Sequence, residues 1–445
     1  DNHAGLMNLE QMDVFRSKMQ IAEGSEWSAY DNLLIEPETA KNFCLQAPFN
    51  KRPPQENEPQ KITIPDNLPL NFRSSTSTQA SFGNILHEVS RGNTDLASRI
   101  VTTSPDVTVS TNLGPWVNQR GVFSLDVRND VFRDEKVASA QKWLRHGTGQ
   151  HFELGIAENN LFIMLAALGL SGPLFGTRLL PIGTLYDPFI ARGLDSLNYA
   201  CYQDARFMLV ATPAGITLAP EGGAHQSISS PLIGIGQPGL SSYEPAYADE
   251  LAVIMRWAFE YMQAEKGGSI YLRLSTRAID QPSREMKPEL ENQIIKGAYW
   301  HIPPTDGARI AIVYSGAVVP EVIEAYEQLK EEIPELGIMA ITSYDRLYHD
   351  WQRSQVKNIE GRNNIDCHVI NLLAPLHSNA ILITVQDAHP ATLSWLGSAT
   401  GRKLLPLGVT EFGQSGNIRD LYRQYGIGAD AIIDAAARAS IKHSN

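Results

Sequence analysis

From about Ser75 onward, short β-rich runs alternate with segments of helix length, and this alternation limits the possible folds more than any other feature of the sequence. Phe207–Ala211 and Ser269–Leu274 are apolar, β-rich runs, and Thr108–Val109 also looks strand-like. Gly155–Leu170 and Tyr247–Ala264 have helical patterns. Strands separated by helices of this length are typical of a largely parallel sheet covered on both faces. The sequence therefore predicts an α/β fold.

Two proline-containing segments divide the chain. Asn42–Leu70 contains six prolines and few apolar residues, so it is expected to be a connector rather than a helix or strand. A second boundary falls at Asp280–Lys287, where Pro282 lies among mixed charges. We therefore expect three parts: a helical tail and proline-rich linker over residues 1–74, a larger α/β domain over 75–285, and a smaller α/β domain over 286–445.

Composition limits the partners and the compartment. Lys and Arg number 37 against 49 Asp and Glu, and the formal net charge of −12 argues against nucleic acid or an anionic membrane as the main partner. Cys44, Cys201 and Cys367 lie far apart, so neither a disulfide framework nor a zinc site is expected.

The sequence shows neither a membrane span nor a signal peptide. The most apolar uncharged stretch, Leu161–Thr177, is too short to span a membrane and is interrupted by glycine and proline. We expect a soluble protein of a reducing compartment, either the cytoplasm or, in a eukaryote, the mitochondrial matrix. The chain begins at Asp1, which suggests that it was trimmed or cut from something larger.

Acidic residues and histidines lie beside glycines at three places, and the first is Gly155-Ile-Ala-Glu158-Asn. Glu158 falls in the first turn of a predicted helix with apolar neighbours. A carboxyl group in apolar surroundings has a raised pKa and can share a proton near neutral pH. The alternative is a first-turn acid that interacts with the helix dipole, and such acids are common.

The second place is Pro220-Glu221-Gly-Gly-Ala-His225. The two glycines allow a close backbone approach, and His225 can transfer protons near pH 7, although an ordinary structural turn fits the pattern equally well. The third place, around His3, indicates no site by itself, because terminal histidines are usually solvated.

Two further patterns have structural explanations. Tyr186 and Phe189 flank the start of a short helix, and core packing is their default role. The glycine-rich run Gly234–Gly239 matches no phosphate-binding pattern and is expected to be a loop.

In combination, these motifs resemble the pyrimidine-binding domain of thiamin-diphosphate enzymes of the transketolase superfamily. The match within the superfamily is to the homodimeric-type decarboxylating component of pyruvate dehydrogenase complexes. Its SYDPAYAYEVAVIM segment is similar to Ser242–Met255, and a family FGxS turn resembles Phe412–Ser415. The resemblance extends over essentially the whole chain.

The resemblance implies roles for the matched residues. Glu158 corresponds to the carboxyl group that hydrogen-bonds a ring nitrogen of the aminopyrimidine and favours its imino tautomer. Phe189 and Tyr186 correspond to aromatic residues against that ring and near the substrate. Glu221 and His225 correspond to groups that handle protons beside the reacting carbon.

Two less similar positions complete the set of candidates. Asp106, in Ser-Pro-Asp-Val, resembles the acid of a family SADL segment that lies near the cofactor. His3 is comparable with a histidine on a mobile active-site loop of the family's first domain.

The departures from the family pattern define what is missing. No Gly-Asp-Gly motif, which binds Mg²⁺ and the diphosphate in the superfamily, occurs in the sequence, and residues 1–60 resemble only the tail of that domain. Pro213 stands where transketolases place a histidine that contacts sugar phosphate, which favours a 2-oxo acid substrate.

The resemblance therefore implies thiamin diphosphate as the cofactor, with Mg²⁺ held by another domain and no metal ligands here. The implied activity is decarboxylation of a pyruvate-like 2-oxo acid with acyl transfer to a lipoyl carrier. The alternatives are ketol transfer and a non-catalytic subunit. The implied partners are a chain or upstream segment with the diphosphate-binding domain, a second copy in a dimer or (αβ)₂ assembly, and a lipoyl acyltransferase.

Overall fold

The computed structural model describes residues 5–31, 33–48, 50, 59–71, 74–92, 94–126, 134–138, 141–359 and 366–444. The chain forms two compact units, Asp1–Glu58 and Pro59–Asn445. Each unit is described by itself below.

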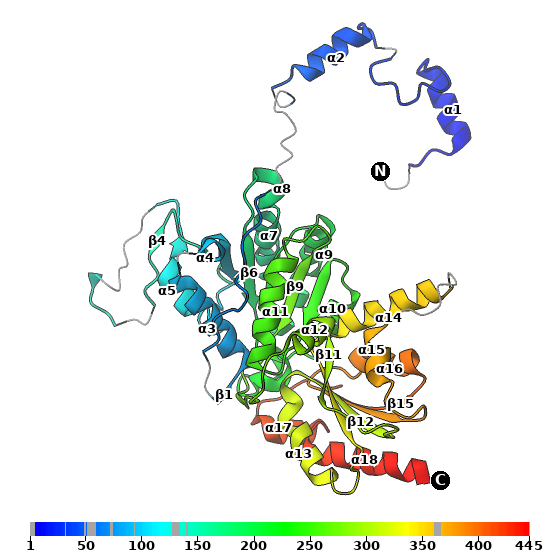
Figure 1. The fold of residues 1–445 in the computed structure, drawn as a ribbon. Coiled ribbons are helices and arrows are strands. Elements are labelled where there is room, and N and C mark those ends of the chain that lie inside the picture. The colour runs from blue at the N-terminus through cyan, green and yellow to red at the C-terminus, as the bar shows by residue number, and fades with distance from the viewer. Residues whose placement is uncertain are drawn as a thin grey trace. The chain divides into compact units, whose positions relative to one another are not determined.

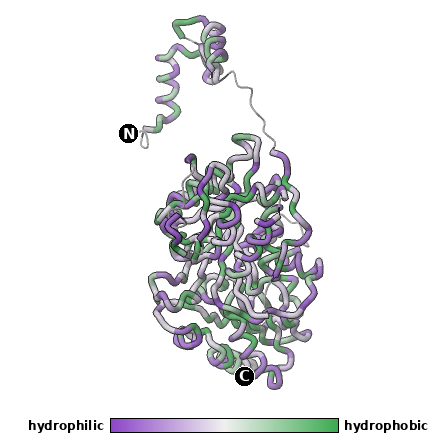
Figure 2. The backbone as a smooth tube through the Cα atoms, turned by 90° about the vertical axis from the view of Figure 1, so that its left-hand side faces the viewer, coloured by the Kyte–Doolittle hydropathy of each residue, from purple (hydrophilic) through white to green (hydrophobic). Residues whose placement is uncertain are grey.

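The first unit contains two helices, α1 (Leu9–Lys18) and α2 (Pro37–Leu45). Asn8 caps α1, because its side chain accepts a hydrogen bond from the backbone N–H of Gln11. Ala40 is the single buried residue among those described in this unit, and Figure 2 shows hydrophobic and hydrophilic stretches mixed along its tube. The predicted helices are present, and their large apolar side chains are mostly exposed within the described part of the unit.

The second unit is built around an eight-stranded sheet in which every described pairing is parallel. Its strand order is β4-β3-β5-β2-β6-β7-β9-β8. Strands β4, β6 and β9 of this sheet are labelled in Figure 1. The strands are β2 (Ile100–Ser104), β3 (Val122–Phe123), β4 (Arg145–His146), β5 (His151–Glu153), β6 (Leu180–Leu185), β7 (Met208–Ala211), β8 (Leu240–Tyr243) and β9 (Ser269–Arg273).

Helices cover both faces of this sheet. Alternate strand residues point to opposite sides, and the residues on each side are apolar and pack against helices. Met208 and Val210 belong to the core cluster that includes residues of α3, α5 and α11, whereas Leu209 and Ala211 belong to the cluster with α7 and α9. The helices are α3 (Thr78–Arg91), α4 (Asp95–Arg99), α5 (Gly114–Arg120), α7 (Glu158–Gly169), α8 (Ser171–Phe175), α9 (Leu194–Tyr202), α10 (Ser230–Gly236) and α11 (Ala248–Tyr261).

A second sheet of five strands follows in the order β11-β13-β12-β14-β15, with β11 antiparallel and the rest parallel. Helices α13, α17 and α18 contribute to the core on one face, and α14, α15 and α16 to the core on the other. The strands are β11 (Ala298–Ile302), β12 (Ile310–Ser315), β13 (Gly337–Ile341), β14 (Ile381–Gln386) and β15 (Lys403–Leu407). The helices are α12 (Pro288–Lys296), α13 (Val319–Leu329), α14 (Tyr344–Ile359), α15 (His368–Leu373), α16 (Ala391–Thr400), α17 (Ile418–Gln424) and α18 (Ala429–Ser444).

A short antiparallel pair, β1 (Ser75–Thr76) with β10 (Ile279–Asp280), joins the two ends of the segment that forms the larger sheet. The predicted α/β class, with a large parallel sheet and a smaller second sheet, is confirmed. The three-part division at residues 74 and 285 remains a prediction. In the described part of the chain, no helix is both long and apolar enough to cross a membrane.

Two local expectations are wrong. Thr108–Val109 is a turn rather than a strand, because the chain turns after β2 with Asp106 at a φ of +68°. Gly234 lies in helix α10 rather than in a loop, because Pro231 occupies a favourable first-turn position and continues the chain as a helix to Gly236.

Candidate cofactor site

The predicted site residues follow strands that are neighbours in the larger sheet. Glu158 begins α7 after β5, Tyr186 follows β6 directly, and His225 ends η3 (Gly223–His225), in the connection that follows β7. In parallel sheets these connections emerge at the carboxyl edge, which is where ligands bind in open α/β folds. The topology therefore brings distant parts of the sequence to one edge.

Three aromatic rings form the centre of the site. The Tyr186 and Phe189 rings lie 6.0 Å apart and nearly parallel, with an interplanar angle of 23°. The His225 ring stands edge-on to both, 5.9 Å from Tyr186 and 5.5 Å from Phe189. The His225 Nδ1 atom is buried and has no hydrogen-bond partner among the described residues. This nitrogen can therefore form a hydrogen bond with a ligand.

Glu158 lies beside these rings and not in open solvent. Its side chain is 10% exposed, and its carboxylate accepts a charge-assisted hydrogen bond from the Arg192 guanidinium. The Arg192 Cζ atom lies 3.7 Å from the centre of the Phe189 ring. Ile156, expected to shield the acid, is instead 79% exposed, so the apolar environment predicted for Glu158 is incomplete. The Phe189 face beside Glu158 thus already accommodates a planar, hydrogen-bonding group.

The other predicted residues are not brought into this cluster. Glu221 and Asp106 are exposed, and neither side chain forms a hydrogen bond or ion pair with the described cluster residues. Asp106 lies at the carboxyl end of β2, where its backbone N–H donates to the Glu153 carboxylate at 3.0 Å. His3 lies outside the described residues.

Glu153 shows how polar groups are organised at this edge of the sheet. Burial raises the pKa of its carboxyl group, but hydrogen bonds from His151 and Thr108 oppose that effect and leave the pKa below its ordinary value. The Thr108 hydroxyl donates to Glu153 at 2.7 Å. An ionised carboxylate is therefore held beside Asp106.

The C-terminal domain packs directly against the His225 turn. The Gln226 side-chain amide donates to the Gln414 carbonyl at 2.9 Å, and the Gly416 N–H donates to the Ala219 carbonyl at 3.2 Å. A Cβ atom on Gly223 would overlap the carbonyl of Gly413, so only glycine fits there without movement. The two motifs noted separately in the sequence, at 220–225 and 412–415, are therefore in contact.

Two arginines of the site were not predicted from the sequence. Arg192 lies three residues after Phe189, the spacing of one helical turn, and this spacing was the available signal. Arg273 is an arginine inside a buried strand, and a charge within an apolar run was a signal for a buried partner.

Arg273 joins a buried charged network next to the cluster. It donates to the carboxylates of Asp187 and Glu244 and to the backbone carbonyl of Asp387. Burial raises the pKa of Glu244 to about 7, with Arg273 opposing the shift. Burial also raises the pKa of Asp387. The buried Arg273 guanidinium thus pairs with two carboxylates and one backbone carbonyl.

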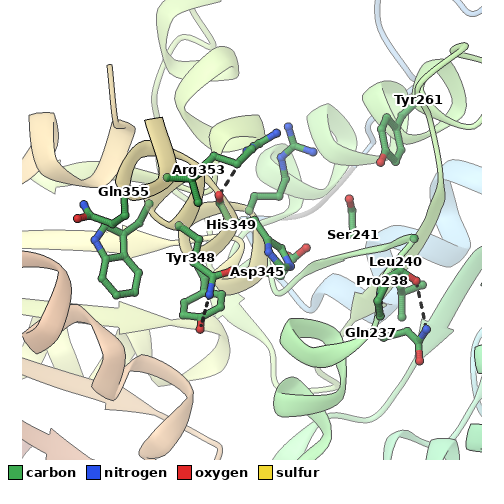
Figure 3. A pocket seen from close by; sticks show the side chains of 15 residues that line it. Gln237, Pro238, Leu240, Ser241, Tyr261, Asp345, Tyr348, His349, Arg353 and Gln355 are labelled. Atoms are coloured by element: carbon green, nitrogen blue, oxygen red, sulfur yellow. Dashed lines mark hydrogen bonds between the residues drawn. The ribbon is translucent and has the colours of Figure 1, made fainter. Parts of the chain in front are cut away.

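A cavity of about 1040 Å³ lies elsewhere, between β8 and α14 (Figure 3). None of the cluster residues lines it. Its walls include Ser241, Tyr261, Asp345, His349 and Arg353. Among the described residues, no group of three or more His, Cys, Asp or Glu side chains is arranged to hold a metal ion.

Comparison with known proteins shows similarity to pyruvate dehydrogenase and transketolase sequences. Residues 72–280 match the family described as the pyruvate dehydrogenase E1 component middle domain. The chain is 26% identical over 365 residues to the pyruvate dehydrogenase E1 component of Escherichia coli K12, covering 77% of this chain and 39% of that protein. It is also 26% identical over 293 residues to a putative transketolase C-terminal section of Methanocaldococcus jannaschii, covering 63% and 80% respectively.

The fold agrees with these relationships. Transketolase from Campylobacter jejuni superposes with a TM-score of 0.63 at 16% identity, over 97% of this chain and 54% of that one. The chain thus has the fold of transketolase. Residues 72–280 are similar to the pyruvate dehydrogenase E1 middle domain, as the sequence motifs predicted. The chain spans less than half the length of the Escherichia coli relative.

Proposed function

We propose that this chain provides the pyrimidine-binding half of a thiamin-diphosphate site that decarboxylates a pyruvate-like 2-oxo acid. One observation carries the proposal. A planar guanidinium already stacks on Phe189 while hydrogen-bonding the nearly buried Glu158 carboxylate. The aminopyrimidine is likewise flat and hydrogen-bonding, so it fits the same place once Arg192 moves away.

Each residue of the cluster would have its own role in binding or proton transfer. Phe189 and Tyr186 would hold the ring by stacking and exclude water from its face. Glu158 would hold a proton at a ring nitrogen, and the orphan Nδ1 of His225 would exchange a proton beside the substrate. The cofactor itself supplies the electron sink for decarboxylation. Mg²⁺ and the diphosphate would be bound by the partner domain.

The proposed partner would cover the exposed apolar side chains of α7, α8 and α9, which we call the apolar face. Large apolar side chains are well exposed there: Ile163 54%, Leu174 58%, Phe175 75%, Tyr199 57% and Tyr202 83%. Patches of this kind on soluble proteins mark interaction sites. We assign this face to the chain or segment that carries the diphosphate-binding domain, in an assembly with at least two copies of each half. A monomer by light scattering in the presence of that partner would contradict the assignment.

The identity of the acyl acceptor is the most specific part of the proposal. The names of the pyruvate dehydrogenase relatives support a 2-oxo acid substrate, and from there a lipoyl acyltransferase as the next partner. Pro213 stands against sugar-phosphate chemistry. Ketol transfer remains the second candidate, because the structural neighbours include transketolase, and product analysis with pyruvate and xylulose phosphate separates the two.

The central test is Glu158→Gln in the assembly that includes the diphosphate-binding domain. Loss of the proton-sharing carboxyl should reduce 2-oxo acid decarboxylation by about 100-fold or more. Glu289→Gln is the matched control, since Glu289 is also a first-turn helix acid but is exposed. Equal activity of both variants would refute the role of Glu158. Absence of thiamin diphosphate binding by the wild-type assembly, measured by calorimetry, would instead support a non-catalytic subunit.

A further inference from the structure

The deepest polar group near the cluster is the carboxylate of Asp187. Asp187 is the first residue of η1 (Asp187–Gly193), the segment that carries Phe189 and Arg192. It is fully buried. Its oxygens accept hydrogen bonds, so each neighbour that donates to them is held relative to η1.

Four donors surround this carboxylate. The Ser227 hydroxyl donates to its Oδ2 atom, as do the Ser230 hydroxyl at 2.6 Å and the Arg273 Nε at 2.8 Å, while the Tyr271 hydroxyl donates to Oδ1. These donors come from α10, β9 and the connection that contains His225. Asp187 therefore ties three elements to η1 at one point.

Ser227 is the donor that matters for the site. It is two residues from His225, is buried, and also accepts hydrogen bonds from the Gly215 N–H at 3.0 Å and the Arg273 guanidinium at 3.2 Å. The His225 side chain itself has no hydrogen bond at its buried Nδ1. Its placement between Tyr186 and Phe189 therefore depends on how its backbone is held.

The C-terminal domain holds the same connection from the other side. Both Asp387 carboxylate oxygens accept from the Ile216 N–H at 3.0 Å, and the His389 N–H donates to the Ile228 carbonyl at 2.9 Å. Arg273 bridges the two sides, because it donates to Asp187 and to the Asp387 carbonyl.

We propose that Asp187 is a positioning residue whose hydrogen bond with Ser227 fixes the His225 ring against Phe189 and Tyr186. Asp187 touches neither ring and acts only through the backbone on both sides of the site. The consequence for catalysis rests on the proposed function, but the positioning itself can be tested without the cofactor.

The test uses nuclear magnetic resonance of the full chain with labelled histidine. Because the His225 ring stands edge-on to two aromatic rings, its carbon-bound protons should carry a ring-current shift, identified by its loss in His225→Gln. Ser227→Ala should move this resonance to the position of a solvated histidine. Ser343→Ala is the control, since Ser343 is also a buried serine that donates to a buried aspartate, Asp345, at 2.7 Å.

Each outcome decides the proposal. Loss of the shift in Ser227→Ala with retention in Ser343→Ala supports it. Retention in both variants, or loss in both, overturns it. If Ser227→Ala does not fold, Ser227→Cys keeps the shape, weakens the donor and is judged by the same resonance.

A second measurement links positioning to the cofactor. In the assembly with the diphosphate-binding domain, Ser227→Ala should weaken thiamin diphosphate binding about tenfold, whereas Ser343→Ala should not. If the wild-type assembly binds no thiamin diphosphate, the proposed function fails while the resonance result still decides the positioning. If the wild type binds and Ser227→Ala binds equally well, the cofactor role of Asp187 is overturned.

Discussion

Arg192 and Arg273 both pair with carboxylates of the same domain, but they do so in opposite environments. The Arg192 side chain is 50% exposed and faces one acid, Glu158. The Arg273 side chain is 2% exposed and faces Asp187 and Glu244, with Asp387 behind them. An exposed pair breaks at little cost, whereas a buried one cannot lose a partner without leaving a charge in a dry interior. The first pair can yield to a ligand, and the second holds the structure that the ligand meets.

The largest expected effect compares the two arginines directly. Arg273→Met should lower the free energy of unfolding by about 3–5 kcal/mol, because buried carboxylates lose their cation. Arg192→Met should change it by less than about 1 kcal/mol. Urea unfolding of the full chain measures both. Similar losses in the two variants would remove the distinction drawn here.

The buried network should also make stability depend on pH. With the Glu244 pKa raised from 4.5 to about 7, the folded chain binds more protons than the unfolded chain between these values. The free energy of unfolding should therefore fall as pH rises through this window, by up to about 3 kcal/mol at about 1.4 kcal/mol per pKa unit. Glu244→Gln should flatten this part of the profile. Glu285→Gln, at an exposed position, should leave it as in the wild type.

The His225 turn extends the comparison to a region held by packing rather than by charge. Gly223→Ala should cost about 1–3 kcal/mol, since its Cβ would overlap the Gly413 carbonyl. Gly236→Ala has no atom within 4 Å of the added Cβ and lies in a helix, so it should be neutral or slightly stabilising. Thermal unfolding of both variants checks this, and equal behaviour would argue against a tight contact between the turn and the C-terminal domain.

The smallest effect concerns the exposed arginine as a competitor for the cofactor position. If Arg192 must leave Phe189 before a pyrimidine can bind, Arg192→Gln should tighten thiamin diphosphate binding about threefold to tenfold. Calorimetry on the assembly measures this. Weaker binding by the variant would show that Arg192 helps to hold the cofactor.

The sequence predicted the sheet and the cluster where the patterns were local or motif-like. The β-rich run Phe207–Ala211 and the helix start near Glu158 depend on neighbouring residues, and both elements are present as β7 and α7. The order of Glu158, Phe189 and His225 along the chain identified residues that the parallel topology then brings to one edge. Thr108–Val109 was misassigned because a positive φ at Asp106 turns the chain, which no local propensity records.

The buried network could not be derived in the same way. Arg273, Asp187 and Asp387 are widely separated in sequence, and their partnership exists only after two sheets have packed together. The contact of Gly223 with Gly413 is of the same kind. Long-range pairings of polar groups leave at most an isolated sign in the sequence, such as a charge within a strand, and not the identity of the partner.

The contacts between the C-terminal domain and the His225 turn set an order of events during translation. The turn leaves the ribosome well before Asp387 and the 412–416 segment have been made. Domains generally fold in the order of their synthesis, so the larger sheet can form while this turn still lacks its outer supports. The contacts that hold the His225 turn are then completed only when the final helices emerge, and a nascent chain interrupted before that point has the larger sheet without these contacts.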